Sequence, residues 1–341
     1  MSNVQSLASP VAAGRPLLKW AGGKRQLLPT LRGFYPVVFQ RYIEPFFGSG
    51  AVFFDLCEAG RLAGHRVLLI DSNPDLIGCY EAVRDRPDDV ASVLEELAAG
   101  YARDGRAHYY VVRDAMFNPL RAERRAHGRI PYTPDLAAML IYLNRTGFNG
   151  LFRVNASGAF NVPAGRYDRP RIVERERLER VADALSAPGV ELRCGTFADV
   201  ASAATAGDFL YVDPPYAPVS ATSSFTAYTA LRFGDAEQRA LQRLMIDLAS
   251  RGCHVLLSNS TAPAIQDLYE GDPQAQAAGL RTLRVPARRA VNSNAARRGS
   301  VEEYVITNIE AESVDVIAHR RSPVVPRSRR SSAAGARPTF R

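Results

Sequence analysis

RYIEPFFGSGAVFFDLCEAGRLAGHRVLLID, residues 41–71, is the stretch that decides the fold. It begins with a short apolar strand at 41–46, turns at the glycine-containing segment 47–50, and continues with helical spacing through 51–59. A second apolar strand, 67–70, closes the stretch and is followed by an aspartate. Strand, glycine turn, helix and strand in this order predict a right-handed βαβ unit, and therefore a parallel sheet.

Further strands are predicted downstream of this unit. Short runs of apolar and β-branched residues indicate strands at 190–193, 208–213 and 253–258, and two more at 283–286 and 301–307. The chain is therefore expected to be an α/β protein built around one sheet.

A different pattern separates the second predicted strand from the third. Residues 81–145 contain charged helical stretches, and residues 146–168 are rich in turn residues. Within the turn-rich part, residues 153–162 have the pattern of a β-hairpin that turns at Ala-Ser-Gly. We expect this part of the chain to form an inserted, mainly helical subdomain that carries a hairpin.

The domain organisation follows from these shifts in composition. The sheet domain is predicted to be discontinuous, comprising 15–80 and 175–312, with the inserted subdomain at 81–174. Residues 1–14 and 318–341 are rich in Ser, Ala, Pro and Arg without periodicity, and are predicted to be flexible tails.

The net charge of +8, with a pI near 9.5, favours a polyanionic partner. Seven arginines between Arg320 and Arg341, where no acid occurs, account for most of it, so the rest of the chain carries about +1. The alternative is thus a basic tail on a nearly neutral protein. Charge alone gives only a moderate preference for nucleic acid.

The four cysteines, at positions 57, 79, 194 and 253, form no CxxC pair. They are expected to be reduced, mostly buried thiols of a cytoplasmic protein, and neither a metal site nor a disulfide framework. No apolar run reaches the length of a membrane span, and the first residues lack the apolar segment of a secretory signal. We expect a monomer by default.

The chemistry is indicated most clearly by Asp213-Pro214-Pro215-Tyr216, which follows the predicted strand at 208–213. It places a carboxylate, a backbone carbonyl outside regular structure and an aromatic face at one strand end. These three groups suit an exocyclic amino group on a flat heterocycle, which needs two hydrogen-bond acceptors and a stacking surface. The alternative is a simple tight turn after a strand.

Two other segments have features of a nucleotide-binding site. Gly48 and Gly50 allow backbone to approach a ligand before a helix N-terminus, and Asp71 stands where an acid binds ribose hydroxyls. The alternative for Asp71 is to cap the next helix. Upstream, Trp20 is available to stack on a purine and Lys24 to meet a carboxylate, although this segment is also consistent with a solvated turn.

These pieces, in this order, resemble the DNA adenine-N6 methyltransferases of the Dam type, from Leu17 to about Asn308. The matching segments are KWAGGK at 19–24, EPFFGSG at 44–50, DSNPDLI at 71–77, LNRTGFNGL at 143–151, GAFNVP at 158–163, DPPYAPVSAT at 213–222, FTAY at 225–228 and LSN at 257–259. The resemblance implies a Rossmann-like sheet that uses S-adenosylmethionine, with the insert acting as the target-recognition domain. It implies cofactor binding by Trp20, Ala21, Gly22, Gly23, Lys24, Glu44, Pro45, Phe46, Gly48, Gly50, Asp71 and Asp213.

The resemblance also implies double-stranded DNA as the partner, with GATC as a first guess for the motif. Asp213 and the Pro214 carbonyl would accept the two N6 hydrogens of an adenine flipped out of the duplex, while Tyr216 stacks on it. Transfer would be a direct in-line displacement without a covalent enzyme intermediate.

The hairpin region is the expected DNA-entering element. The candidate DNA contacts are Arg145, Asn149, Arg153, Asn155, Phe160 and Arg166, together with Asn294, Arg297 and Arg298 from a polar loop between the last two strands. Hairpin arginines bind phosphates more often than bases, and the polar loop is also consistent with a solvated charge run.

Two other functions compete with adenine methylation: methylation of cytosine N4 at a site of the same geometry, and DNA binding without catalysis. The intact residues 213–216 and the intact glycine turn argue against a decayed enzyme. A nicotinamide-dependent dehydrogenase would explain the glycine turn and Asp71 but leaves residues 213–216 without a role.

Overall fold

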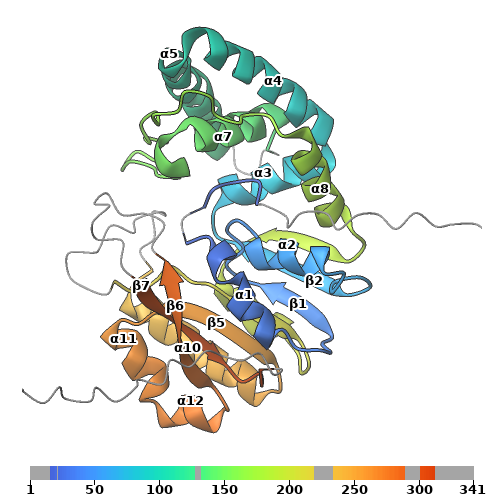
Figure 1. The fold of residues 1–341 in the computed structure, drawn as a ribbon, viewed down its shortest axis with the longest axis vertical. Helices are drawn as coiled ribbons and strands as arrows, with labels where there is room; N and C mark the ends of the chain where they lie inside the picture. Colours follow the sequence, from blue (N-terminus) through green and yellow to red (C-terminus); the bar gives the residue numbers. More distant parts are fainter. Residues whose placement is uncertain (1–15, 21, 127–131, 219–232, 289–299, 312–341) are drawn as a thin grey trace, which may run out of the picture.

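The computed structural model describes residues 16–20, 22–126, 132–218, 233–288 and 300–311. Its centre is a seven-stranded sheet with the order β3-β2-β1-β4-β5-β7-β6 (Figure 1). The strands are β1 (Arg41–Glu44), β2 (Arg66–Asp71), β3 (Val190–Cys194), β4 (Phe209–Val212), β5 (His254–Ser260), β6 (Arg281–Arg288) and β7 (Ser300–Thr307). The strands that the sequence predicts are confirmed, with small differences at their ends.

The direction of the strands defines where a ligand can bind. Strands β1 to β5 run parallel, whereas β7 is antiparallel to both β5 and β6. The strand order reverses at β1, which pairs with β2 on one side and β4 on the other. In open α/β sheets, ligands bind outside the carboxyl ends of the strands at such a reversal.

Both faces of the sheet are covered, because alternate side chains of a strand point to opposite faces. Phe209 and Tyr211 of β4 pack into a core shared with α2 (Ala51–Glu58), α3 (Pro74–Asp85) and α8 (Arg175–Ser186). Leu210 and Val212 pack into the opposite core, which includes α10 (Asp235–Ser250). The short elements around the sheet are η1 (Lys24–Gln26), α1 (Leu28–Leu31), η2 (Arg32–Phe34), η5 (Phe197–Asp199), α9 (Val200–Ala203), α11 (Pro263–Ile265), η7 (Gln266–Glu270) and α12 (Pro273–Ala277).

The inserted helices lie beyond one end of the sheet (Figure 1). They are α4 (Pro87–Asp104), α5 (Arg106–Tyr110), η3 (Val111–Phe117), α6 (Asn118–Ala126), α7 (Pro134–Thr146) and η4 (Phe148–Gly150). The Thr133 hydroxyl caps α7 by accepting the Leu136 N–H at 3.2 Å. Every residue from Leu136 to Thr146 is buried, so α7 is the central helix of this subdomain.

The predicted hairpin at 153–162 forms its turn, but its strands are not regular. Val154 and Phe160 make an isolated bridge, and the Asn155 N–H donates to the Ala159 carbonyl at 2.9 Å. The Asn155 side-chain oxygen accepts the Ala159 N–H at 2.9 Å and the Ser157 hydroxyl at 2.7 Å. An asparagine side chain that satisfies the turn in this way competes with a continuous ladder, which explains the difference.

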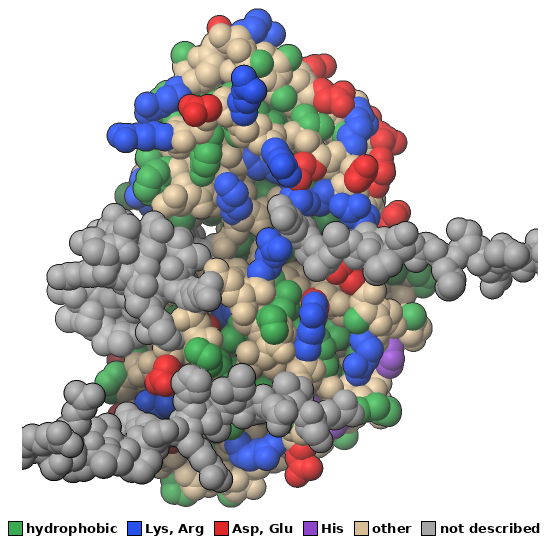
Figure 2. Space-filling model, in the orientation of Figure 1, with side chains coloured by type: hydrophobic (Ala, Val, Ile, Leu, Met, Phe, Trp, Pro, Cys, Tyr) green, Lys and Arg blue, Asp and Glu red, His purple; other side chains and the backbone are tan. Residues whose placement is uncertain are grey.

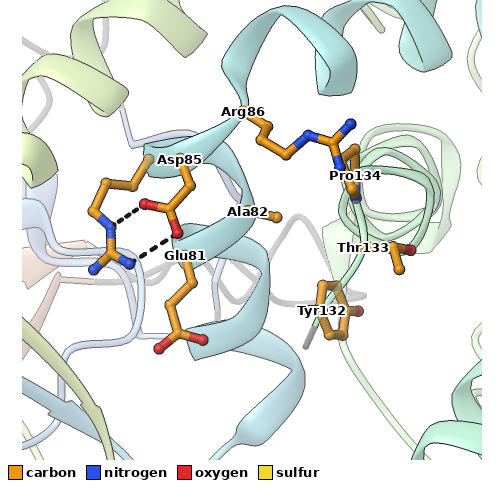
Figure 3. A pocket seen from close by; sticks show the side chains of 8 residues that line it. Glu81, Ala82, Asp85, Arg86, Tyr132, Thr133 and Pro134 are labelled. Carbon is orange, nitrogen blue, oxygen red and sulfur yellow. Dashed lines mark hydrogen bonds and ion pairs between the residues drawn. The ribbon is translucent and has the colours of Figure 1, made fainter. Parts of the chain in front are cut away.

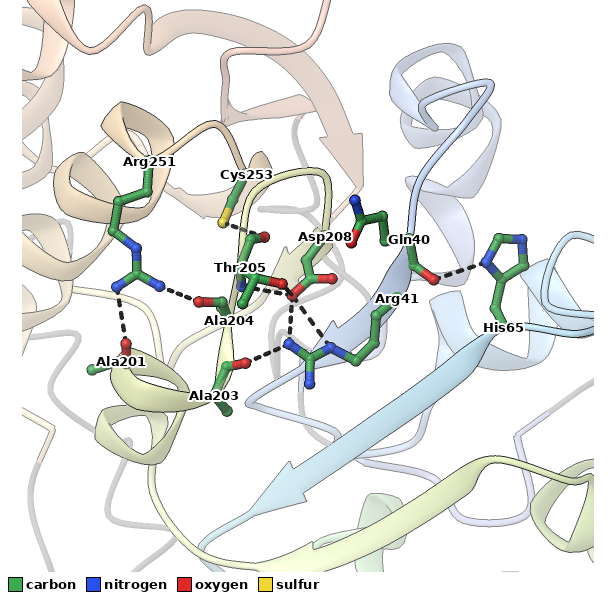
Figure 4. A network of polar contacts seen from close by, with 10 residues as sticks. All are labelled: Gln40, Arg41, His65, Ala201, Ala203, Ala204, Thr205, Asp208, Arg251 and Cys253. Atoms are coloured by element: carbon green, nitrogen blue, oxygen red, sulfur yellow. Dashed lines mark hydrogen bonds and ion pairs between the residues drawn. The ribbon is translucent and has the colours of Figure 1, made fainter.

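A polar network braces the amino ends of the central strands, at the edge of the sheet opposite residues 213–216 (Figure 4). Arg41 of β1 pairs with Asp208 at 2.6 Å, and Asp208 also accepts the Thr205 N–H at 2.8 Å. Arg251 donates to the Ala201 carbonyl, and the Cys253 thiol donates to the Thr205 carbonyl. All these groups are satisfied internally, so we assign them to stability.

None of the four cysteines, all of which lie in the described residues, forms a disulfide. Cys79 and Cys253 are buried, and Cys57 is half-buried. Cys194 is exposed, and it departs from the expectation of mostly buried thiols. In the described part of the chain, no helix is long and apolar enough to cross a membrane, and no three His, Cys, Asp or Glu side chains are grouped to hold a metal ion.

Candidate active site

Three carboxylates lie at the carboxyl ends of the strands that flank the reversal in strand order. Glu44 ends β1, Asp71 ends β2, and Asp213 follows β4 directly. Because the carboxyl ends of parallel strands share one edge of the sheet, residues far apart in sequence meet here. Three of the residues that the sequence singles out are therefore brought to one edge of the sheet.

Asp213 is held by two donors that use the same oxygen. The Lys24 ammonium lies 2.7 Å from Oδ1, and the Ser258 hydroxyl donates to Oδ1 at 2.9 Å. No donor from the described residues bonds to Oδ2. Burial raises the pKa of Asp213 above its usual range, while Lys24 and Ser258 oppose that rise. One carboxylate oxygen is thus anchored and the other is available to a ligand.

Tyr216 presents its ring beside this carboxylate. Its hydroxyl donates to Oε2 of Glu303 on β7 at 2.8 Å, and the Lys24 ammonium lies 4.5 Å from the ring centroid. Burial raises the pKa of Tyr216 well above its usual range, so the hydroxyl remains a neutral donor. The ring therefore has a defined position next to Asp213.

The two prolines differ in their carbonyl partners. The Pro215 carbonyl accepts the Gln238 side-chain N–H at 2.9 Å. The Pro214 carbonyl accepts no hydrogen bond from the described part of the chain. Pro214 therefore offers a second acceptor beside Oδ2 of Asp213.

The glycine turn and Asp71 form one unit. Gly48 and Gly50 have φ values of 50° and 68°, in the left-handed region that favours glycine, and a Cβ on Gly50 would lie 2.5 Å from the Phe47 ring. Asp71 accepts the Gly48 N–H on one oxygen and the Asn73 N–H on the other, both at 2.9 Å. The N-cap of α3 is Asn73, so Asp71 is not needed for capping.

Glu44 lies beneath the loop that follows β1. Its side chain is 2% exposed and accepts the Tyr42 hydroxyl at 2.7 Å. Burial raises the pKa of Glu44 well above its usual range. Pro45, which follows it, is also buried. The charges of Asp213 and Asp71 add to the rise in the pKa of Glu44, so Glu44 lies close to both carboxylates.

Phe46 belongs to an aromatic cluster that the sequence did not indicate. Its ring stacks on Phe197 at 5.7 Å between centroids and meets Phe233 edge-on at 5.6 Å. Phe197 and Phe233 also contact each other. The three residues come from distant parts of the chain, and the one local signal is the position of Phe197 shortly after the end of β3.

The segment around Trp20 joins the site to the inserted helices. The Trp20 ring stacks on Phe152 at 5.6 Å, and the Lys19 backbone exchanges two hydrogen bonds with the Asn144 side chain of α7, each at 2.8 Å. The Gly22 carbonyl accepts from the Lys24 ammonium at 2.5 Å. Gly23 is exposed, and Ala21 lies outside the described residues.

Known proteins that resemble this chain decide its family. The family model of the D12 class N6 adenine-specific DNA methyltransferases matches residues 20–284. The chain belongs to this family. Its members are enzymes that methylate N6 of adenine in DNA.

The similarity to individual relatives extends over most of this methyltransferase and over most of each relative. Type II methyltransferase M1.LlaDCHI of Lactococcus lactis subsp. cremoris is 36% identical over 86% of this chain and 95% of its own. Type II methyltransferase M.MjaIII of Methanocaldococcus jannaschii is 35% identical over 86% and 99%. The DNA adenine methylase of Escherichia coli K12 is 34% identical over 85% and 94%.

Four of the predicted DNA contacts of the methyltransferase are exposed: Asn149, Arg153, Asn155 and Arg166. Asn149 has a φ of 54°, and Arg153 bonds to the Asn161 side chain at 2.8 Å. Phe148, which has no distinguishing pattern in the sequence, is 49% exposed beside Asn149. An exposed aromatic ring next to exposed polar side chains is a signal that only the structure supplies. Asn294, Arg297 and Arg298 lie outside the described residues.

Two predicted DNA contacts of the methyltransferase are not available in this structure. Arg145 is 7% exposed, and it pairs with Glu174 and donates to the Arg171 carbonyl at 2.9 Å. Phe160 is 1% exposed and packs against Phe117 and Phe152. The expectation that Arg145 and Phe160 contact DNA therefore has to be corrected, because both are committed to the interior.

Charge is unevenly distributed over the visible face of the methyltransferase. Figure 2 shows Lys and Arg side chains scattered over the inserted helices and down the middle of the face, with Asp and Glu gathered along one edge of the helical part. An open hollow of about 400 Å³ lies between the end of α3 and the start of α7, where Arg84 pairs with Asp85 (Figure 3). Asp213 is not among its lining residues, so this hollow is separate from the site.

Proposed function

We propose that this methyltransferase transfers a methyl group from S-adenosylmethionine to N6 of an adenine flipped out of duplex DNA. The observation that carries the proposal is the position of the Lys24 ammonium. It donates to the carboxylate of Asp213 and lies over the face of Tyr216. A site that holds a nitrogen donor against a carboxylate and above an aromatic ring has the chemistry needed for an exocyclic amino group on a purine.

The reacting amino group would be held by two acceptors. Oδ2 of Asp213 accepts one N6 hydrogen and the Pro214 carbonyl accepts the other, while the purine stacks on Tyr216. Two acceptors on one side favour a pyramidal nitrogen with its lone pair directed away from them. Positioning and electrostatics then supply most of the catalysis, because no covalent intermediate is needed.

The residues around the glycine turn fit the cofactor. S-adenosylmethionine supplies a methyl group already activated on a positively charged sulfur. Asp71 has acceptor capacity for ribose hydroxyls beyond its two backbone contacts, since a carboxylate offers about four lone-pair sites. Gly48 and Gly50 let the backbone approach the ligand, and the cluster around Phe46 offers apolar surface for the adenine ring. The proposed contacts also include Trp20, Ala21, Gly22, Gly23, Lys24, Glu44 and Pro45.

The inserted subdomain, residues 81–174, is the proposed target-recognition domain. Its exposed Asn149, Arg153, Asn155 and Arg166 are the proposed DNA contacts, and the aromatic ring of Phe148 joins them. Asn294, Arg297 and Arg298 remain proposed contacts from their position in the sequence. We propose GATC as the first motif to test.

The test is methyl transfer from labelled S-adenosylmethionine to unmethylated genomic DNA, followed by single-molecule mapping of the modified bases. We expect N6-methyladenine in one short motif, with no transfer by the Asp213→Ala variant and largely unchanged DNA binding. Detection of N4-methylcytosine instead would show that the methylated group is N4 of cytosine and not N6 of adenine. Transfer by Asp213→Ala at the wild-type rate would show that the site is wrongly assigned.

A further inference from the structure

Gln238 is a buried polar residue next to the catalytic motif that contacts neither the proposed base nor the proposed cofactor. It lies in the first turn of α10 and is 3% exposed. Its side-chain N–H donates to the Pro215 carbonyl at 2.9 Å, and its side-chain oxygen accepts the Asn259 side-chain N–H at 3.1 Å. Asn259 lies in β5 and is completely buried.

The direction of these hydrogen bonds is determined at both ends. The Ser260 backbone N–H can only donate, and it bonds to Oδ1 of Asn259 at 2.8 Å. Asn259 must therefore turn its amide nitrogen to Gln238, and Gln238 must turn its own amide nitrogen to the Pro215 carbonyl, which can only accept. Neither amide can flip without breaking two hydrogen bonds. These hydrogen bonds therefore form a rigid series, with fixed donors and acceptors, from β5 to the catalytic motif.

Proline geometry extends this control to the neighbouring carbonyl. Three torsions separate the Pro214 carbonyl from the Pro215 carbonyl: ω of their peptide bond, and φ and ψ of Pro215. The bond is trans, because the described residues contain no cis peptide, and the ring locks φ. The 214–215 peptide plane can therefore turn only by coupled rotation about ψ of Pro214 and ψ of Pro215, and the hydrogen bond from Gln238 restrains that motion by holding the Pro215 carbonyl.

We infer that Gln238 is a positioning residue of methyl transfer, which aims the Pro214 carbonyl at the amino group by fixing the carbonyl of Pro215. The inference rests on the proposed function, in which Pro214 accepts an N6 hydrogen. Gln238 occupies the Pro215 carbonyl and leaves the Pro214 carbonyl to the substrate. Removing it allows the acceptor to rotate, and a misplacement of about 1 Å in a reacting group can lower a rate about a hundredfold.

Gln242 supplies a matched control. It lies one turn further along α10 and is 6% exposed, and it donates to the Leu268 carbonyl at 2.5 Å and to Asp272 at 2.9 Å. Its contacts therefore resemble those of Gln238 in burial and number but point to η7 and the start of α12. A purely structural role for these glutamines predicts similar effects from both.

The experiment compares the full-length Gln238→Leu and Gln242→Leu variants in single-turnover methylation of a DNA duplex carrying the mapped motif. We expect Gln238→Leu to lower the rate per folded molecule about ten- to a hundredfold, with KM for DNA and for S-adenosylmethionine within about twofold. Gln242→Leu should lower the melting temperature but leave that rate unchanged. A Gln238→Leu rate within twofold of wild type, or an equal loss in Gln242→Leu, overturns the inference.

A second variant gives a pH dependence that lost packing cannot produce. This test remains usable if Gln238→Leu fails to fold. Gln238→Glu keeps the shape but directs a carboxylate at the Pro215 carbonyl, and only the protonated carboxyl group can donate there. We expect its rate relative to wild type to rise as pH falls, and a constant ratio overturns the inference. If Asp213→Ala remained active, the proposed function would fail instead, so the two failures are distinguishable.

Discussion

The ammonium nitrogen of Lys24 lies 2.7 Å from Oδ1 of Asp213, and the Lys24 side chain is only 6% exposed. The pair joins η1 to the residue that follows β4, so it links the proposed cofactor segment with the proposed catalytic motif. It also keeps a positive charge beside the carboxylate that, in the proposed mechanism, accepts an N6 hydrogen. The resemblance had implied a cofactor contact for Lys24, and the structure adds this contact with Asp213.

The first prediction concerns the acid limb of the pH–rate profile. Burial raises the pKa of Asp213, Lys24 and Ser258 lower it, and the charge of Glu303 raises it. Lys24→Met and Ser258→Ala should therefore move the acid limb of kcat to higher pH, with the larger shift for Lys24→Met. Glu303→Gln should move it to lower pH. Shifts of one sign in all three variants would show that another group controls this limb.

The same pKa shift predicts a pH dependence of stability. The folded-state pKa of Asp213 lies above its ordinary value, so the folded chain binds this proton more tightly than the unfolded chain does. This stabilisation is fully present below the ordinary pKa and is lost as pH rises through the raised one. Urea unfolding across this range measures the free energy of unfolding of wild type and of Asp213→Asn. The difference between the two free energies should be larger at neutral pH and should shrink at low pH.

The third prediction separates two arginines that the sequence treats alike. Arg145→Ala should destabilise the fold by about 3 kcal/mol, because it leaves the carbonyls of Arg171 and Leu17 without their donor and removes one of the two arginines that pair with Glu174. Arg153→Ala, at an exposed position, should change stability by less than about 0.5 kcal/mol and weaken DNA binding instead. Urea unfolding and DNA titration measure both effects. Normal stability of Arg145→Ala would contradict the interior role assigned to it.

Phe148 and Phe160 form a similar pair of aromatic residues. Phe160→Ala should destabilise the fold by about 3–5 kcal/mol, since its ring is 1% exposed and packs between Phe117 and Phe152. Phe148→Ala should leave the melting temperature nearly unchanged and weaken DNA binding, because the ring is 49% exposed. Equal melting temperatures for the two variants would refute this assignment.

Trp20 is the sole tryptophan of the chain, so intrinsic fluorescence reports on the proposed cofactor segment. Titration with S-adenosylmethionine should change the emission of wild type and leave that of Trp20→Phe flat. Asp71→Ala should bind at least about tenfold more weakly, because hydrogen bonds to a charged group contribute about 1.5–3 kcal/mol. Unaltered affinity in Asp71→Ala would exclude this residue from the cofactor site.

The position of the proposed catalytic motif at a strand end could be predicted because its information is local. Residues 213–216 carry the carboxylate, the carbonyl and the ring within four positions. They directly follow β4 in the chain, so they lie at its carboxyl end wherever that strand forms. The βαβ unit at 41–71 could be predicted for the same reason, since strand and helix periodicities are properties of short segments.

The irregular segment after α7 could not be predicted at the level of single side chains. Arg145 lies in the last turn of α7, where every residue from Leu136 to Thr146 is buried. Phe160 lies in a turn region where no period assigns a residue to one face. Local pattern is informative only where a regular repeat separates an inner face from an outer one. Here tertiary packing decides whether a side chain is inside.

The sequence by itself determined the α/β class, the order of the strands along the chain and the chemical groups at their ends, because these depend on neighbouring residues. Only the tertiary structure decided which distant groups meet. It brings Lys24 to Asp213, Glu303 to Tyr216, and Gln238 to the Pro215 carbonyl. Such contacts form because the strand order reverses at β1 and several strand ends share one edge of the sheet. No local sequence pattern encodes which strand ends lie side by side.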